Sequence, residues 1–245
     1  MKNFNYKTAS NTKEAIKLFT KKAAFLAGGM TLLPAIKLRL AAYSDLVNIK
    51  KIKSLSGIKA SSKSVKIGSI TTHASVASSE EIKKTIPSIA ALAEGIGDPQ
   101  VRNRGTIGGS VANNDPAADY PSACLALNST IHTNKRKISA DKFFKGMFDT
   151  ALKKGELIEA IEFEIPEKSA YEKFPNPASR YAIVGVFVAK LKNETRVAIT
   201  GAGSCVFRSK DLEIALSSNF TSSAIDNINI LSDELNSDIH ASAEY

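Results

Sequence analysis

Between Gly95 and Pro121 the chain reads GIGDPQVRNRGTIGGSVANNDPAADYP, a segment with little helical or strand periodicity in a protein of 245 residues. It contains five glycines, three prolines and two adjacent asparagines. A long irregular segment inside a compact domain is usually functional, because it adds little to the core. We therefore expect Ile96–Pro121 to be an irregular connection that carries part of a binding or active site.

On both sides of this segment, helical and strand patterns are mixed, which indicates an α+β chain. We predict helices at 8–20 (with Asn11 or Thr12 as the N-cap), 71–77, 79–84, 87–94, 119–127, 208–216 and 222–230. We predict strands at 23–27, 46–49, 65–67, 157–166, 182–189 and 196–200. The segment 182–189 is almost entirely apolar, so it should be a central strand of its sheet.

Two further segments suggest where domains begin and end. Glu167–Ser179 is rich in Pro, Lys and Ser and is interpreted as the boundary between a large N-terminal and a smaller C-terminal domain. The final residues 241–245, ASAEY, have the pattern of a helix start without a stop signal, so we expect a truncated C-terminal domain.

Composition excludes several classes of protein. Hydrophobic residues make up 43% and charged residues 23%, which fits a globular domain rather than a disordered chain. No apolar run approaches the roughly 18 residues of a membrane span, and the N-terminus lacks the apolar core of a secretory signal. We therefore expect a cytoplasmic protein.

The net charge of +9 is unevenly distributed. Residues 1–60 contain twelve Lys or Arg against two acidic residues, whereas residues 221–245 contain five acidic residues and no Lys or Arg. Such a basic half is compatible with an anionic cofactor, an acidic subunit surface or a solvated lysine-rich face. The absence of tryptophan and of aromatics among the lysines argues against nucleic-acid binding.

The cysteines and histidines do not predict a metal site. Cys124 and Cys205 stand in apolar surroundings and are interpreted as buried, reduced thiols, because two cysteines cannot form an iron–sulfur site or a disulfide framework. His73, His132 and His240 lack the spacing of metal ligands.

Two glycine pairs, Gly28–Gly29 and Gly108–Gly109, each follow a strand-like segment. Glycine pairs allow successive backbone N–H groups to converge on an anion, an arrangement called a nest. Thr31, Thr106 and Ser110 flank the pairs and could add hydroxyl donors. One such turn is usually structural, but two in one chain suggest a clamp on a diphosphate.

Familiar phosphate motifs are missing or poor. The chain has no G-x-x-x-x-G-K-[ST] motif, and its one Rossmann-like match, Gly201–Gly203, has Val206 at the third glycine position and is interpreted as a structural turn. Asp115 precedes a proline and is interpreted as a turn former. Asp119 could either cap a helix or accept hydrogen bonds from the hydroxyls of a ribose.

Three segments together resemble the FAD-binding medium subunit of the aerobic carbon monoxide dehydrogenase / xanthine dehydrogenase (molybdenum hydroxylase) family. They are AGGMTLLPAIKLRL (27–40), RNRGTIGGSVANNDPAADYP (102–121) and YEKFPNPASRYAIVGVFVA (171–189). The resemblance extends over nearly the whole chain, with these segments in the family's order and separations.

This resemblance implies an α+β fold with a two-subdomain FAD-binding domain of the vanillyl-alcohol-oxidase (PCMH) type at residues 1–170. Its subdomains would span about 1–55 and 56–170. A small α+β domain like the C-terminal domain of carbon monoxide dehydrogenase flavoproteins would follow at 178–245.

The resemblance also implies which residues contact FAD. Two loops would wrap the pyrophosphate, formed by Phe25, Leu26, Ala27, Gly28, Gly29, Met30, Thr31 and Leu32, and by Thr106, Ile107, Gly108, Gly109 and Ser110. Asp119 would hold ribose or ribityl hydroxyls, and Ile158 and Lys173 would also contact FAD. Tyr181 would shield one face of the isoalloxazine, unless it is an ordinary aromatic residue at the start of a core strand. Met30 departs from the family, which often has His or Gln there.

The implied function is that of an oxidoreductase subunit that transfers electrons and has no catalytic acid or base of its own. FAD would receive electrons from [2Fe-2S] clusters in a small subunit, which would be supplied by the molybdenum cofactor of a large subunit, in a dimer of heterotrimers. The complex would lie in the cytoplasm or at the inner face of the membrane. Alternatives are a stand-alone FAD-dependent oxidoreductase of the same fold and a flavin-free interaction subunit. Neither the substrate nor the electron acceptor follows from the sequence.

Overall fold

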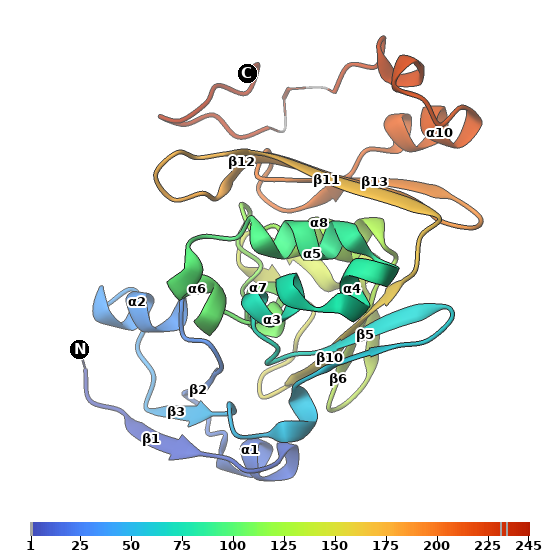
Figure 1. Ribbon diagram of the computed structural model, residues 1–245. Helices are drawn as coiled ribbons and strands as arrows, with labels where there is room; N and C mark the ends of the chain where they lie inside the picture. The colour runs from blue at the N-terminus through green and yellow to red at the C-terminus, as the bar shows by residue number, and fades with distance from the viewer. Residues whose placement is uncertain (1, 231, 234) are drawn as a thin grey trace.

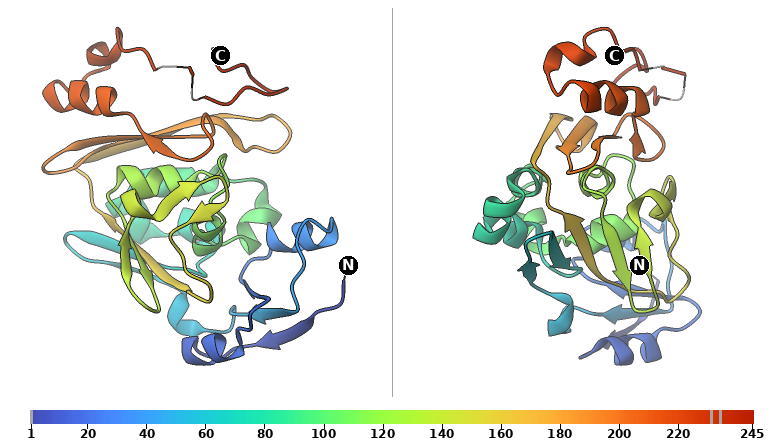
Figure 2. Two further views of the ribbon diagram at one scale, coloured as in Figure 1. Left: turned by 180° about the vertical axis from the view of Figure 1, so that it is seen from behind. Right: turned by 90° about the vertical axis from the view of Figure 1, so that its right-hand side faces the viewer.

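The structure is a computed structural model that describes residues 2–230, 232–233 and 235–245. The described residues form four β-sheets, one of them with only two strands. The three larger sheets follow one another along the length of the molecule, and most of the helices lie between the second and third of these (Figures 1 and 2). The two ends of the chain lie far apart, at the first and third sheets respectively (Figure 1).

The first sheet is small and parallel. Its order is β1 (Asn5–Thr8), β3 (Asp45–Asn48), β2 (Ala23–Leu26), and the chain between these strands forms α1 (Thr12–Leu18) and α2 (Leu32–Lys37). The predicted helix 8–20 begins too early, because residues 5–8 pair with β3. Asn11 is the N-cap as predicted, and its side chain accepts a hydrogen bond from the Glu14 N–H at 2.9 Å.

The second sheet is antiparallel and has five strands. Its order is β4 (Ile58–Ala60), β5 (Ser64–Gly68), β10 (Ile158–Glu164), β6 (Thr130–Thr133), β7 (Lys137–Ser139). Short elements connect to it: η1 (Lys53–Leu55), α9 (Ala140–Phe143), β8 (Phe144–Gly146) and β9 (Asp149–Thr150). The predicted strands at 65–67 and 157–166 are confirmed.

Six short helices cover this sheet. They are α3 (His73–Ser78), α4 (Glu80–Thr85), α5 (Pro87–Glu94), α6 (Pro99–Arg104), α7 (Ile107–Asn113) and α8 (Tyr120–Ala126). The prediction that residues 96–121 are irregular is wrong for α6 and α7. Asp98 caps α6 by accepting from the Val101 N–H at 2.7 Å, and Thr106 caps α7. These caps outweigh the poor helix propensity of the glycines.

The third sheet is antiparallel and has four strands. Its order is β11 (Lys168–Pro175), β12 (Ala182–Lys190), β13 (Thr195–Thr200), β14 (Phe207–Arg208), followed by α10 (Lys210–Ser218) and η2 (Ser222–Ile225). The central position predicted for residues 182–189 is confirmed. Much of the predicted domain boundary at 167–179 is regular structure, because β11 pairs with β12 along its length. The predicted helix 222–230 is reduced to a single 3₁₀ turn, and residues 241–245 are not helical.

One continuous core joins the second and third sheets. Phe187, Ala189 and Ala198 of the third sheet belong to the same buried cluster as Ile89 of α5 and Leu125 of α8. The first sheet packs in two smaller clusters, one of which also includes Ile70 and Leu157 beside strands of the second sheet. The predicted domain bounds, 1–170 and 178–245, therefore stay a prediction, and residues 168–170 already belong to β11.

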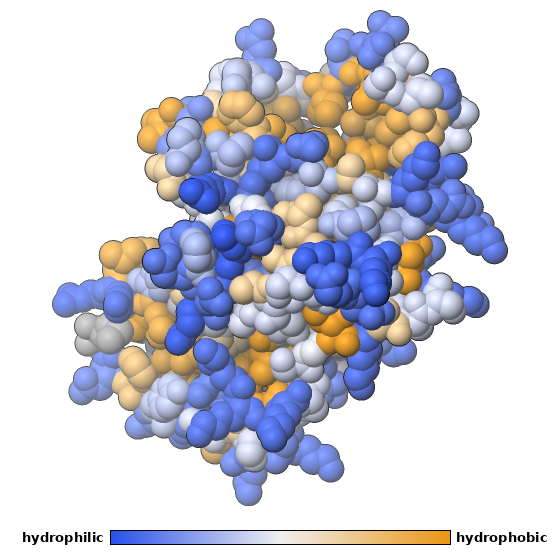
Figure 3. All heavy atoms as spheres, viewed as in Figure 1, coloured by the Kyte–Doolittle hydropathy of each residue, from blue (hydrophilic) through white to orange (hydrophobic). Residues whose placement is uncertain are grey.

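Hydrophilic residues cover most of the face shown in Figure 3, with apolar residues scattered among them. None of the helices in the described ranges is long and apolar enough to cross a bilayer. Within the same ranges no group of three His, Cys, Asp or Glu side chains could hold a metal ion. Both cysteines are free thiols. Cys124 is fully buried, which raises its pKa to about 12, whereas Cys205 is only partly buried.

Candidate functional site

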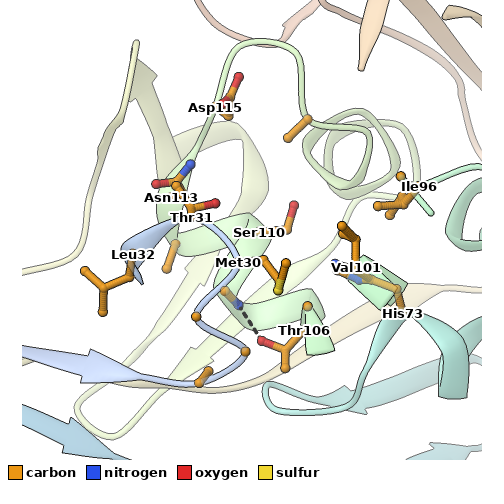
Figure 4. A pocket seen from close by; sticks show the side chains of 18 of the residues that line it. Met30, Thr31, Leu32, His73, Ile96, Val101, Thr106, Ser110, Asn113 and Asp115 are labelled. Atoms are coloured by element: carbon orange, nitrogen blue, oxygen red, sulfur yellow. Dashed lines mark hydrogen bonds between the residues drawn. The ribbon is translucent and has the colours of Figure 1, made fainter. Parts of the chain in front are cut away.

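Residues of both glycine pairs, namely Gly28, Gly29 and Gly109, line a single cavity of about 510 Å³. This volume lies within the roughly 300–1,000 Å³ of cavities that hold small molecules and cofactors. We call residues 27–32, between β2 and α2, the first glycine loop, and residues 106–110, at the start of α7, the second glycine loop. A clamp on one ligand requires the two loops to share a cavity, and they do (Figure 4).

The loops meet because Gly28 has no side chain. Its Cα lies directly against the backbone carbonyl of Arg104 and against Gly105, just before the second glycine loop. A Cβ at residue 28 would lie 2.8 Å from the Arg104 carbonyl carbon and 2.9 Å from the Gly105 Cα, both well inside normal contact. Gly29 has φ +78°, which a residue with a side chain rarely adopts.

The first glycine loop presents unpaired backbone donors. No acceptor in the described part of the chain binds the N–H groups of residues 28–31. The next donor, the Leu33 N–H, bonds the Gly29 carbonyl at 3.1 Å and begins α2. Thr31 occupies the cap position of α2, but its hydroxyl makes no capping bond and is available to a ligand. These free donors are compatible with the nest that the sequence predicted, and the nest stays a prediction.

The second glycine loop forms no such nest, so the prediction is wrong there. The Gly108 N–H donates to the Ser69 carbonyl at 2.8 Å, and the Gly109 N–H donates to the Thr106 hydroxyl at 3.1 Å (Figure 4). Both donors complete the first turn of α7. The loop instead offers hydroxyl groups, because Ser110 lines the cavity and its side chain has no hydrogen-bond partner among residues 2–230, 232–233 and 235–245.

Asp119 presents a carboxylate to the cavity. Its side chain does not cap α8. Instead Oδ1 accepts a hydrogen bond from the Tyr171 hydroxyl at 2.5 Å and lies 3.0 Å from the Lys173 Nζ. No other described residue donates to Oδ2, so this oxygen can accept from a ligand hydroxyl. Burial raises the pKa of Asp119, and Lys173 and Tyr171 oppose that shift.

Lys173 does not line the cavity, although a contact with the cofactor was predicted for it. Besides Asp119, its ammonium donates to the carbonyl oxygens of Gly95 at 2.8 Å and Arg180 at 3.0 Å. It thus ties the end of α5 to the turn between β11 and β12. The geometry favours an organising role for Lys173 over direct contact with a ligand.

A second cavity of about 300 Å³ adjoins the first. The two share Ala24, Phe25, Ala27, Tyr43, Gly109 and Ala112 as lining residues. Ile158 and Gly108 line only this smaller cavity, whose other walls are mostly apolar. Leu26 and Ile107 line neither cavity, since their side chains are buried in the core.

Most of the other residues predicted to contact FAD do line the larger cavity. They are Phe25, Ala27, Gly28, Gly29, Met30, Thr31, Leu32, Thr106, Gly109, Ser110, Asp119 and Tyr181. Tyr181 precedes β12 and is 45% exposed at the cavity, so the alternative of a core aromatic residue is wrong. Burial and the nearby carboxylates of Asp115 and Asp119 raise its pKa.

The sequence did not single out two residues that line this cavity. Arg180 is the one permanently charged cation on its walls within the described ranges, and it has φ +61° in the turn before β12. The only signal for it was its position next to Tyr181. His73, at the start of α3, is 5% exposed, and its Nδ1 is buried without a hydrogen-bond partner in the described chain. Burial lowers its pKa to about 4, with a smaller contribution from Arg102.

Comparison with known proteins places the chain among flavoproteins. Residues 2–168 match the model of the family described as FAD binding domain in molybdopterin dehydrogenase. The chain is 35% identical over 86% of its length to the glyceraldehyde dehydrogenase medium chain of Sulfolobus acidocaldarius, of which 79% is covered. It is 33% identical to the carbon monoxide dehydrogenase medium chain of Hydrogenophaga pseudoflava, over 84% of this chain and 77% of that one.

The fold comparison agrees. A chain of reconstituted carbon monoxide dehydrogenase from Oligotropha carboxidovorans superposes with a TM-score of 0.90 at 28% identity, covering 100% of this chain and 92% of the other. The α+β fold with an FAD-binding domain that the resemblance implied is therefore confirmed.

Proposed function

Because the chain belongs to the family of FAD-binding domains in molybdopterin dehydrogenases, we propose that it transfers electrons from an iron–sulfur partner, through FAD, to an external acceptor. The family membership establishes that this is an FAD-binding subunit of an oxidoreductase. The route of the electrons and the identities of the partners are the parts we propose.

The two adjoining cavities support this proposal, because a dinucleotide has two ring systems joined by a diphosphate. We place the diphosphate where the cavities meet, against the free N–H groups of the first glycine loop and the hydroxyls of the second. The flavin would occupy the larger cavity, where Tyr181 can cover one face and Asp119 can accept from ribityl hydroxyls. The adenine would occupy the smaller, mostly apolar cavity beside Ile158.

The protein's part in the reaction would be to bind, orient and shield. When bound, FAD supplies the redox chemistry, since it can accept and release electrons. The nest fixes the diphosphate without a lysine, and Arg180 adds one positive charge at the cavity. Lys173 fixes Asp119 against the turn that carries Tyr181. No residue of this chain needs to act as an acid or base on the organic substrate.

The names of the relatives support the presence of partner subunits. Several relatives are medium chains or subunits, which are parts of larger assemblies. We propose a small subunit with [2Fe-2S] clusters and a large subunit with the molybdenum cofactor, in a dimer of heterotrimers. The relatives are named for glyceraldehyde, carbon monoxide and nicotine, so the substrate would be selected by the large subunit.

The experiment is co-expression with the candidate partner subunits, followed by measurement of flavin, iron and molybdenum per complex. We expect one FAD per copy of this chain, and a complex without stoichiometric FAD would contradict the proposal. The matched variants are Gly109→Leu, at a glycine that lines both cavities and whose added Cβ would lie 2.9 Å from the Thr106 hydroxyl, and Gly146→Leu, where nothing lies within 4 Å of an added Cβ. Gly109→Leu should lose FAD with unchanged circular dichroism, and Gly146→Leu should keep it.

The same preparation tests the stand-alone alternative. If the chain without partners oxidised a small molecule with bound FAD and an added acceptor, it would need no iron–sulfur subunit. If Gly109→Leu kept full FAD content, the cofactor would bind elsewhere in the chain.

A further inference from the structure

His73 is a buried side chain at the edge of the cavity that the proposed function leaves without a role. It follows Thr72, the N-cap of α3, and its backbone N–H donates to the Gly105 carbonyl at 3.0 Å. Its ring lies 5.4 Å from the ring of Tyr120, centroid to centroid. The residue is 95% shielded from solvent yet lines the cavity together with both glycine loops.

The two ring nitrogens have different surroundings. Nδ1 is sealed from solvent and has no hydrogen-bond partner in the described residues. Nε2 lies against Gly105, since a Cβ added at that glycine would be 2.5 Å from it. Gly105 is also the residue that Gly28 contacts. Nε2 therefore lies beside the point where the two glycine loops meet.

The surroundings select one protonation state. The imidazole stays neutral at physiological pH because burial, aided by the positive charge of Arg102, disfavours its cation. A buried N–H without an acceptor is rarer than a buried acceptor without a donor, so the single proton belongs on Nε2 rather than on Nδ1. A neutral His73 thus points an N–H donor toward the cavity.

We propose that His73 donates a hydrogen bond from Nε2 to a diphosphate oxygen of the bound dinucleotide. This proposal rests on the proposed function, in that it takes the ligand of the cavity to be FAD. It assigns to His73 the donor that the second glycine loop lacks, because the N–H groups of Gly108 and Gly109 are occupied within the protein. The diphosphate would then be held by backbone donors on one side and by an imidazole on the other.

Three substitutions separate this role from a structural one. His73→Gln keeps an N–H donor near the position of Nε2, His73→Asn keeps one only near the position of Nδ1, and His73→Phe keeps the ring shape without a donor. The probes are FAD, ADP, which keeps the diphosphate, and riboflavin, which lacks it. Binding is measured on the full chain with the partner subunits it retains, after removal of flavin. Flavin fluorescence reports FAD and riboflavin, and competition reports ADP.

We expect His73→Phe and His73→Asn to weaken FAD and ADP binding about ten- to a hundredfold, as for loss of a hydrogen bond to a charged group. His73→Gln should stay within about threefold of the wild type, and riboflavin binding should change little in any variant. Thermal unfolding checks that each variant folds. If His73→Phe does not fold, the FAD affinities of His73→Gln and His73→Asn are compared instead, and that comparison tests the proposal.

The proposal would be overturned by FAD binding of the Asn variant equal to that of the Gln variant, or by riboflavin binding that falls as much as FAD binding. A ¹⁵N spectrum that places the proton of His73 on Nδ1 in the flavin-free protein would also overturn it. If the wild type binds none of the three probes, the proposed function itself fails. If the wild type binds FAD and the variants bind it equally well, only the role of His73 fails.

Discussion

Gly28→Ala is the smallest change that should separate the two glycine loops. The added methyl carbon would lie 2.8 Å and 2.9 Å from backbone carbons of Arg104 and Gly105, where ordinary contact is about 3.5 Å or more. Because the obstacle is backbone, no side chain can rotate away. The loops must move apart by the better part of an ångström, and such overpacking costs about 1–3 kcal/mol of folding free energy.

Gly28→Ala should weaken FAD binding more than it weakens folding. Moving the loops apart displaces the free N–H groups of residues 28–31 relative to Thr106 and Ser110, so a diphosphate can no longer reach both loops at good hydrogen-bond distance. Losing one hydrogen bond to a charged group weakens binding about ten- to a hundredfold. We expect this loss in FAD affinity by flavin fluorescence, together with a lower midpoint of urea unfolding in the flavin-free protein.

Gly146→Ala is the matched control. Nothing lies within 4 Å of a Cβ at residue 146, and the residue does not have a positive φ. Alanine there should leave FAD binding unchanged and stabilise the fold slightly, by about 0.4–1 kcal/mol, through the unfolded chain. If Gly28→Ala behaved like Gly146→Ala in both assays, the contact between the loops would not be what organises the site.

Three further predictions concern buried titratable groups. Asp119→Asn should destabilise the fold by about 3–5 kcal/mol because it leaves the Lys173 ammonium without its carboxylate, and adding Lys173→Met should recover part of this loss in urea unfolding. The pKa of His73 is lowered to about 4 in the folded protein, so as the pH falls, the imidazole takes up a proton in the unfolded chain before it does so in the folded protein. Stability should therefore fall by about 3 kcal/mol as pH drops from 6.5 to 4, and His73→Gln should flatten that part of the pH profile. In the native protein a thiol reagent should label Cys205 but not Cys124, whereas in denaturant it should label both.

The sequence predicted correctly those elements whose conformation is determined by residues close together in the chain. Pro87 begins α5, and Glu94 ends it just before a glycine, as the pattern indicated. The apolar run of β12 predicted a strand buried by neighbours on both sides. The tight turn of the first glycine loop was also predictable. The turn needs a positive φ at residue 29, and glycine is the residue that adopts it most readily.

What the sequence could not predict depends on distant partners. The residues of β11 alternate between exposed and half-buried, so its stability comes from pairing with β12 rather than from its own pattern. Asp119 stands at a helix start and also fitted the pattern of a helix cap, but its carboxylate is instead held by Tyr171 and Lys173, more than 50 residues away in the chain. His73 drew no attention because its significance lies in its contact with Gly105, 32 residues further along the chain.

The cavity is therefore a joint product of the three larger sheets, and this has a consequence for stability. The first glycine loop comes from the first sheet, the second glycine loop and Asp119 from the helices over the second sheet, and Tyr181 from the third. A ligand that binds only when these parts are together stabilises their assembly by mass action. The hydrophobic clusters of the first sheet are separate from the core that the second and third sheets share, although one of them includes Ile70 and Leu157 next to the second sheet. Flavin should thus protect the first sheet from hydrogen exchange more than it protects the third sheet, which already shares a core with the second.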